Sequence, residues 1–148
     1  MSLWALFASP LLIGCDLTRM DDFTLSLLTN DEVLEVNQDP LGFHGVPVWR
    51  AKDGSQVIYV KHLEDGSLAV GMFNCGETDV KMSINPKMLG LYDGDRTVRD
   101  LWRQKDVGSL VMNNGAYTAT VAPHGVHLVR VYPGNSETRY VGKVTYAN

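Results

Sequence analysis

The pattern of apolar positions divides the chain into two regions of different periodicity. Residues 3–15 are almost continuously apolar up to Asp16, and after them apolar side chains recur every three or four residues as far as Val36. From Val46 onward the period falls to two, and glycine-containing turn dipeptides separate the alternating runs. Because helices have a period near 3.6 and strands a period of two, the pattern predicts a helical region followed by a β domain.

The apolar opening, LWALFASPLLIGCDL, predicts the end of a helix followed by a buried strand. Leu3 and Leu6 share one helical face, and Pro10 prevents the helix from continuing. Residues 11–15 are apolar on both faces, which is typical of a parallel strand covered on each side. Burial of about ten such side chains is worth roughly 15–30 kcal/mol, so we expect residues 3–15 to pack against a partner.

Two other interpretations of this opening are weaker. The apolar run is broken by Pro10 and ended by Asp16, so it falls short of the ~20 residues that cross a bilayer as a helix, and no membrane partner is expected. Residues 12–15 resemble a bacterial lipobox, but only Met1 and Ser2 precede the run, where a signal peptide requires basic residues. We therefore expect no signal peptide in this chain, and its localisation is unknown.

Two helices are expected between the apolar opening and the β region. Thr18 stands three residues before Asp21, which fits the start of a helix over the apolar positions that follow. Thr29 and Glu32 have the spacing of a capping box and predict a second helix that ends before Pro40. The expected order of helix, buried strand, helix and helix is typical of one unit of a larger parallel sheet.

Seven or eight short strands are expected from residue 46 to about residue 132. Successive residues alternate between two faces in runs that begin at Leu68, Asp79, Tyr117 and Val126, and apolar residues occupy at least one face of each run. Strands of this length and spacing predict an antiparallel β-sandwich of the Greek-key type, so the fold class is mainly β. A last edge strand is expected within residues 140–146, although this tail carries less pattern.

Composition narrows the classes of partner. The 13 Lys and Arg residues are scattered among 17 Asp and Glu, for a net charge of −4, so no basic stripe is available for nucleic acid. Cys15 and Cys75 have no CxxC spacing and are expected to be free thiols, with a disulfide between them left open. His124 and His127 flank a glycine turn without a third ligand, so neither a metal nor another cofactor is expected.

Two further groups resemble functional sites but have simpler explanations. Asp21 and Asp22 are adjacent in a predicted helix, where neighbouring side chains point apart and acidic residues favour the first turn. Four aromatic residues would form a sugar-stacking platform if they lay in one row, although aromatic side chains in a sandwich more often belong to the core. These residues are Trp49, Tyr59, Trp102 and Tyr117.

The stretches LWALFASPLLIGCDLTRM, LLTNDEVLEVNQDPLG, DLW and PHGVHLVRV resemble the C-terminal part of glycoside hydrolase family 27, the α-galactosidases. The resemblance implies a (β/α)8 barrel followed by an antiparallel β-sandwich. Residues 3–9 would end the seventh barrel helix, residues 11–15 would be the eighth strand, and residues 18–38 the closing helices. We therefore assign residues 1–42 to the terminal segment of a truncated (β/α)8 catalytic barrel and residues 43–148 to the β-sandwich.

The resemblance also implies a chemistry that this chain does not complete. Enzymes of this family hydrolyse terminal α-galactosides with retention, which requires a nucleophile and an acid/base carboxyl group about 5–5.5 Å apart. Both aspartates belong to motifs of the KYD and SDD type on earlier barrel strands, and neither motif occurs in this sequence. Tyr92 and Asp93 share only two letters with the first motif and lie at a predicted turn. No catalytic residue is assigned, and the sugar specificity stays open.

Cys15 and Asp16 are the residues expected nearest the substrate. They follow the eighth strand at its carboxyl end, where barrel enzymes build their active sites. For Asp16 the favoured alternative is an N-terminal cap of the helix that starts near Thr18.

Two functions of different classes are compatible with these observations. One is the C-terminal portion of a retaining α-galactosidase-type hydrolase, inactive alone, whose sandwich braces the barrel. Such a chain would pack on the rest of the barrel, on a second copy of itself, or on its own sandwich through residues 3–15. The alternative is a stand-alone, non-catalytic carbohydrate-binding or structural β-sandwich module.

Overall fold

The computed structural model describes residues 1–92, 94–112 and 115–133, in which helices precede strands as the pattern predicts. The helices are α1 (Ser2–Leu6), the 3-10 helix η1 (Leu17–Arg19), α2 (Asp22–Leu28) and α3 (Asp31–Asn37). The strands are β1 (Val46–Arg50), β2 (Gln56–His62), β3 (Leu68–Asn74), β4 (Val80–Ile84), β5 (Arg96–Asp100), β6 (Lys105–Leu110), β7 (Tyr117–Val121) and β8 (Val126–Pro133). The edge strand predicted within residues 140–146 lies outside the described residues.

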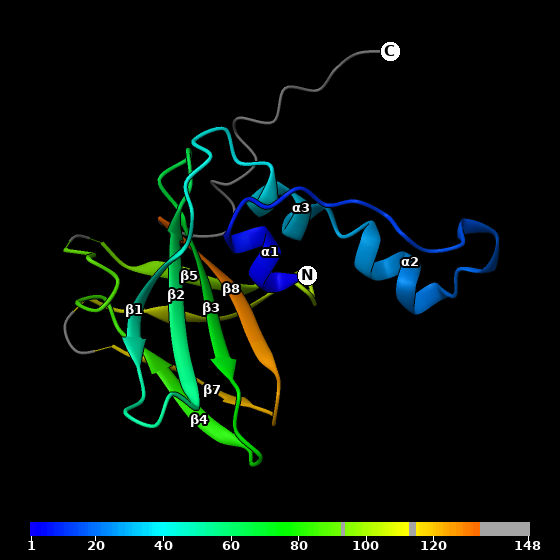
Figure 1. Ribbon diagram of the computed structural model, residues 1–148. Coiled ribbons are helices and arrows are strands. Elements are labelled where there is room, and N and C mark those ends of the chain that lie inside the picture. Colours follow the sequence, from blue (N-terminus) through cyan, green and yellow to red (C-terminus); the bar gives the residue numbers. More distant parts are fainter. Residues whose placement is uncertain (93, 113–114, 134–148) are drawn as a thin grey trace.

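The strands form a six-stranded sheet in the order β1-β2-β3-β8-β5-β6 and a two-stranded sheet of β4 and β7. Every pairing is antiparallel. In Figure 1 the β4–β7 sheet lies across one face of the larger sheet. The prediction of a mainly β, antiparallel sandwich after a helical segment is therefore confirmed.

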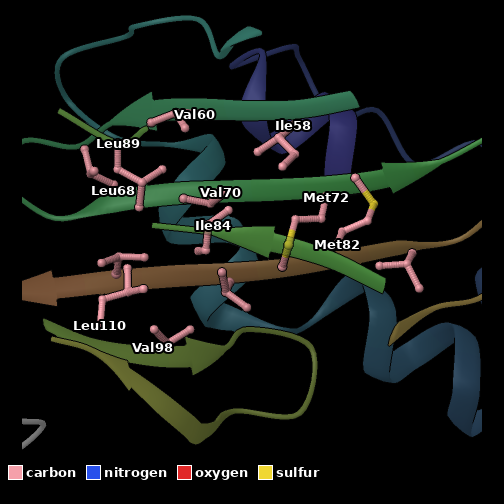
Figure 2. Packing of buried hydrophobic residues seen from close by; sticks show 13 residues of the cluster. Ile58, Val60, Leu68, Val70, Met72, Met82, Ile84, Leu89, Val98 and Leu110 are labelled. Atoms are coloured by element: carbon pink, nitrogen blue, oxygen red, sulfur yellow. The ribbon is translucent and has the colours of Figure 1, made fainter. Parts of the chain in front are cut away.

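Alternate residues of β3 enter two different hydrophobic cores. Leu68, Val70 and Met72 belong to the core between the sheets, and in Figure 2 Val70 lies beside Ile84 of β4 and Met72 beside Met82. The intervening positions of β3 pack into a second core on the opposite face, beneath α1 and α3. This central strand is apolar at nearly every position because both of its faces are covered.

The second core joins the helices to the outer face of the six-stranded sheet. Its buried members from α1 and α3 are Ala5, Leu6, Val33 and Val36, and its members from the β region are Leu63, Ala69, Leu101 and Leu128. Figure 1 shows α1 and α3 against the sheet, whereas α2 extends away from it. Two of the predicted closing helices thus differ in role, since only α3 is built into the sandwich.

The helix starts differ from the prediction. Asp21 rather than Thr18 caps α2, and Asn30 rather than Thr29 caps α3. Each side-chain oxygen accepts a hydrogen bond from the backbone N–H three residues later, at 2.7 Å and 3.0 Å. Asp and Asn cap more strongly than Thr, and Glu32 is engaged elsewhere, so the predicted capping box does not form.

The parallel strand predicted at residues 11–15 does not form either. These residues lie outside every helix and strand of the described chain, with Leu12 91% and Ile13 59% exposed. A strand needs a hydrogen-bonded neighbour, and the described strands pair with one another in the two sheets. Ala5 and Leu6 of the apolar opening need no outside partner, because this chain buries them against its own sandwich.

Candidate functional site

Three cationic side chains of the large sheet hold α3 in place. Arg99 of β5 binds Glu32, Arg130 of β8 binds Glu35, and Lys61 of β2 donates to a backbone carbonyl near the end of the helix. From the start of α3 to its end, the contacted strands are β5, β8 and β2, which is also their order across the sheet. The helix therefore runs across the strands. We call this set of contacts the helix–sheet junction.

The pair of Arg99 and Glu32 is the most closely coupled contact of the junction. Arg99 Nε lies 2.9 and 2.7 Å from the two carboxylate oxygens of Glu32, and Nη2 lies 2.6 Å from Oε1. Both side chains are about 15% exposed. Hydrogen bonds to Glu32, with a smaller contribution from Asp106, raise the pKa of Arg99 above its usual value. Such forked, charge-assisted pairs are directional as well as strong.

Lys61 lies fully buried beneath α1 and α3. Its ammonium donates to the backbone carbonyls of Val36 and, at 3.3 Å, Ala5. Burial lowers the pKa of Lys61, and the charge of Asp39 opposes this shift in part. A cation at the C-terminal ends of two helices is favourable because the exposed carbonyls there carry partial negative charge.

The approach of α1 to the sheet depends on a glycine. Leu6 is fully buried, and a Cβ atom built on Gly71 of β3 would lie 2.6 Å from its Cδ1. A second glycine, Gly45, lies against the Leu6 backbone and donates its N–H to the Leu6 carbonyl at 2.8 Å. The absence of side chains at these two positions allows α1 to sit close to β3.

The predicted substrate-proximal residues lie in the segment between α1 and η1, and both are exposed. Cys15 and Asp16 line an open hollow of about 370 Å³ together with Arg19, Met20 and Thr24. Asp16 Oδ1 accepts hydrogen bonds from the Thr18 hydroxyl at 2.7 Å and the Thr18 N–H at 3.0 Å. Asp16 is therefore a cap as predicted, but of the short 3-10 helix η1 and not of α2, which Asp21 caps. The two hydrogen bonds from Thr18 lower the pKa of Asp16.

The two cysteines and the paired aspartates have the structural roles expected of them. Cys15 and Cys75 are both free and exposed. Asp21 caps α2 and Asp22 occupies its first turn. Neither pair brings two chemical groups together at a site.

The two histidines have different partners. His127 Nε2 lies 2.8 Å from the Tyr117 hydroxyl, with the two rings stacked, and its Nδ1 lies 3.7 Å from a carboxylate oxygen of Asp100. Burial lowers the pKa of His127, and Asp100 opposes the shift. His124 contacts exposed Glu77 at 3.2 Å. Within the described ranges, no three His, Cys, Asp or Glu side chains are grouped to hold a metal ion.

The four aromatic candidates do not form a row. Tyr59 packs edge-on against Phe7 and Phe73 beneath α1. Trp102 packs against the helix-side core, and its Nε1 donates to Ser2 at 2.9 Å. Tyr117 is partly buried and packs against the core between the sheets, and Trp49 lies on the edge strand β1. The interpretation as core side chains is therefore confirmed for three of the four.

Seven large apolar side chains of the helical region are exposed, and we call this set the apolar face. It consists of Leu3, Trp4, Leu12, Ile13, Leu17, Phe23 and Leu25, which are 39–91% exposed. A cavity of about 360 Å³ lined by Trp4, Leu12 and Ile13 opens on it, and a second of about 680 Å³ lies between α2 and Trp102. Trp4, Leu12 and Ile13 therefore form an exposed apolar patch of the kind that marks a contact site. No helix in the described part of the chain is long and apolar enough to cross a bilayer.

Sequence reasoning missed the helix–sheet junction. The alternation of β2 places Lys61 on the same face as Tyr59, a face that is apolar elsewhere, and this position was the available signal. Glu32 and Glu35 stand three residues apart, which puts them on one side of α3. Tyr92, of the incomplete catalytic motif, is exposed, and Asp93 lies outside the described residues.

Comparison with known proteins identifies close relatives. Residues 53–131 match the α-galactosidase C-terminal β-sandwich domain. A probable α-galactosidase of Dictyostelium discoideum is 37% identical over 142 residues, which cover 90% of this chain and 35% of the relative. The crystal structure of α-galactosidase I from Mortierella vinacea is similar with a TM-score of 0.80 at 28% identity, covering 90% of this chain and 34% of that one.

A third relative has a different named activity. A family 27 β-L-arabinopyranosidase from Geobacillus stearothermophilus gives a TM-score of 0.79 at 34% identity, covering 97% of this chain and 30% of that one. The present chain therefore spans about a third of the length of the relatives it matches.

Proposed function

Because the chain belongs to glycoside hydrolase family 27, the α-galactosidase family, we propose that it forms the C-terminal portion of a retaining hydrolase of terminal α-galactosides. Within this family the chain corresponds to the C-terminal region, which includes the β-sandwich domain. In this proposal residues 1–42 are the terminal segment of the (β/α)8 catalytic barrel and residues 43–148 are the sandwich that braces it. The nucleophile and acid/base aspartates come from outside these 148 residues. The chain is therefore inactive alone.

One observation carries the proposal: the helical region is anchored on one side and unpartnered on the other. The helix–sheet junction fixes α3 to the sandwich, while Trp4, Leu12 and Ile13 of the apolar face remain exposed. Burial of a large apolar side chain is worth about 1.5–3 kcal/mol, so contact with the rest of a barrel would add several such increments. This arrangement supports a bracing role.

Cys15 and Asp16 are the residues that this proposal places near the sugar. They stand in the segment that becomes the end of a barrel strand when neighbouring strands are present. Both hydrogen bonds to Thr18 use Asp16 Oδ1, so Oδ2 is available to accept a hydrogen bond from a sugar hydroxyl. The sugar itself is not specified, because relatives of comparable identity are named for different glycosides.

A chimeric enzyme tests the proposal. The C-terminal region of the Dictyostelium relative is replaced by this chain, and hydrolysis of a nitrophenyl α-galactoside is measured for the chimera, for the relative without its C-terminal region, and for the isolated chain. We expect turnover by the chimera only. A folded chimera without activity, or turnover by the isolated chain, would contradict the proposal.

The alternative function has a direct test of its own. Titration of the isolated chain with melibiose, followed by tryptophan fluorescence, reports sugar binding by the sandwich. Because Tyr59, Trp102 and Tyr117 pack into the two cores, we expect no saturable change. Saturable binding without hydrolysis would favour a carbohydrate-binding module.

A further inference from the structure

The C-terminal end of α1 is held by side chains and backbone from three later parts of the chain. Helix α1 has only five residues, and backbone hydrogen bonds close its C-terminal turn: the Ala8 N–H donates to Ala5 O at 3.2 Å and the Ser9 N–H to Trp4 O at 3.0 Å. In addition, each carbonyl of residues 4–7 accepts a hydrogen bond from α3, from the segment before β1, or from β2. The pairs are Asn37 Nδ2 to Trp4 O at 3.3 Å, Lys61 Nζ to Ala5 O at 3.3 Å, Gly45 N to Leu6 O at 2.8 Å, and His44 Nδ1 with Phe7 O at 2.6 Å.

These contacts, which we call the exit clamp, determine where α1 lies. An isolated helix of this length is not stable in water, so its position comes from tertiary contacts. Asn37 and Lys61 are both buried, and they reach α1 across 33 and 56 residues of sequence. Hydrogen bonds formed in a buried site are directional, whereas the apolar contacts beneath α1 are not.

The clamp also sets the direction in which the chain leaves the helix. Ala8 adopts a left-handed backbone conformation with φ of 50°, which costs a residue with a Cβ atom about 1–2 kcal/mol. Asn37 Nδ2 donates to the Ser9 carbonyl at 2.8 Å, immediately after this bend. A strained bend persists only where surrounding contacts determine it. The backbone N–H groups of Ala8 and Ser9 hold it locally, and the amide of Asn37 adds a tertiary contact on the residue that follows.

We propose that Asn37 and Lys61 are positioning residues of the hydrolase: by clamping the exit of α1, they set where the segment that bears Cys15 and Asp16 enters the catalytic domain. This inference rests on the proposed function. Neither residue touches the sugar. Asn37 acts on the chain direction after Ala8, and Lys61 fixes the helix that precedes it.

The clamp is tested first in the chain itself. Asn37→Leu and Lys61→Met remove the donors while keeping approximate side-chain size, and Lys52→Met removes an exposed lysine as a control. Carbonyl ¹³C resonances report the individual hydrogen bonds. We expect Lys61→Met to shift those of Ala5 and Val36, and Asn37→Leu to shift those of Trp4 and Ser9. Amide exchange of Ala8 and Ser9 should accelerate about tenfold or more, with the β2–β3 amides unchanged.

The positioning role is tested in the chimeric enzyme. We expect each variant to raise KM about threefold or more with kcat changed less than about twofold, because substrate orientation is lost while the reacting carboxyl groups are untouched. Ala8→Val is a second variant, because a β-branched side chain disfavours the left-handed bend without unpairing a buried group, and it should raise KM in the same way. Lys52→Met should leave KM unchanged.

The possible failures are distinguishable. If the carbonyl resonances do not shift in Asn37→Leu or Lys61→Met, the exit clamp does not exist and the inference is wrong. If they shift while KM remains at the wild-type value in all three variants, the positioning role is wrong and the proposed function stands. If the unmodified chimera is folded and inactive, the proposed function fails, and the inference fails with it.

Discussion

Substitutions at Leu6 and Gly71 should change the free energy of unfolding in a coupled way, because the Leu6 side chain fills the space that a side chain at position 71 would need. Leu6 is fully buried between α1 and the sheet, with its Cδ1 in the volume that a Cβ on Gly71 would need. The substitution Gly71→Ala would bring that Cβ to 2.6 Å from Leu6 Cδ1 and 2.7 Å from the Phe73 ring. Real Cβ contacts do not occur at these distances, so α1 or both side chains must move.

The structure gives the size of each effect. Removal of a fully buried leucine side chain by Leu6→Ala should cost about 2–5 kcal/mol. Overpacking by Gly71→Ala should cost about 1–3 kcal/mol. In the double variant, Cδ1 is absent and the added methyl group fills part of the cavity. The destabilisation of the double variant should then be smaller than the sum of the two single destabilisations by at least about 1 kcal/mol. Independent sites add to within ~0.5 kcal/mol, so this difference would show coupling.

Urea unfolding of the wild type, both single variants and the double variant, followed by tryptophan fluorescence, measures this coupling. Gly108→Ala provides the matched control, because its Cβ would approach the Tyr117 ring at 3.1 Å on the opposite side of the sheet. Leu6→Ala and Gly108→Ala should be additive. If Leu6→Ala and Gly71→Ala are additive as well, the close packing of α1 on β3 is not the feature that fixes the helix.

Three further predictions concern the junction, the buried histidine and the apolar face. Glu32→Gln should lower the free energy of unfolding by about 1–3 kcal/mol, because it weakens the forked pair with Arg99. Glu35→Gln should cost less than about 1 kcal/mol, because Glu35 is 43% exposed. Equal urea midpoints for the two variants would contradict this difference. Burial lowers the pKa of His127 in the folded chain, so the unfolded chain binds protons more readily; the contribution of His127 to folding stability is complete above about pH 6.5 and is lost as the pH falls through the lowered pKa. His127→Gln should therefore flatten the dependence of the free energy of unfolding on pH over this range, and an unchanged dependence would contradict the prediction. The isolated chain should self-associate through the apolar face, and Leu12→Asp with Ile13→Asp should reduce association in light scattering; a monomeric wild type at high concentration would count against this surface as a contact site.

Local patterns in the sequence predict the strands well because each pattern has a single physical cause. Leu68, Val70 and Met72 alternate along β3 because they line one core, and Asp65-Gly66 marks the preceding turn because Gly66 has a φ of 79°. Helix starts were less predictable. Adjacent residues such as Thr29 and Asn30 both suit a cap, and the choice depends on contacts made by the rest of the helix.

Features that depend on distant segments were not predictable from these patterns. The apolar run at residues 11–15 has the composition of a buried strand, but composition does not supply the neighbour with which a strand pairs. The exit clamp joins residues up to 56 positions apart, and its donors are common polar residues with no motif of their own. Only the position of Lys61 on an otherwise apolar strand face indicated that a buried polar group was present.

The buried cations of the helix–sheet junction are better explained by their effect on the orientation of α3 than by a contribution to the free energy of unfolding. Replacing a buried ion pair by apolar groups of similar volume is often neutral or stabilising, because desolvation offsets much of the attraction. Val33 and Val36 already give α3 an apolar contact with the sheet, yet such contact alone leaves the helix free to slide or turn. Glu32 with Arg99, and the carbonyl of Val36 with Lys61, fix opposite ends of α3 to two different strands. The proposed bracing of a barrel by this sandwich requires a fixed orientation of α3 more than it requires added free energy.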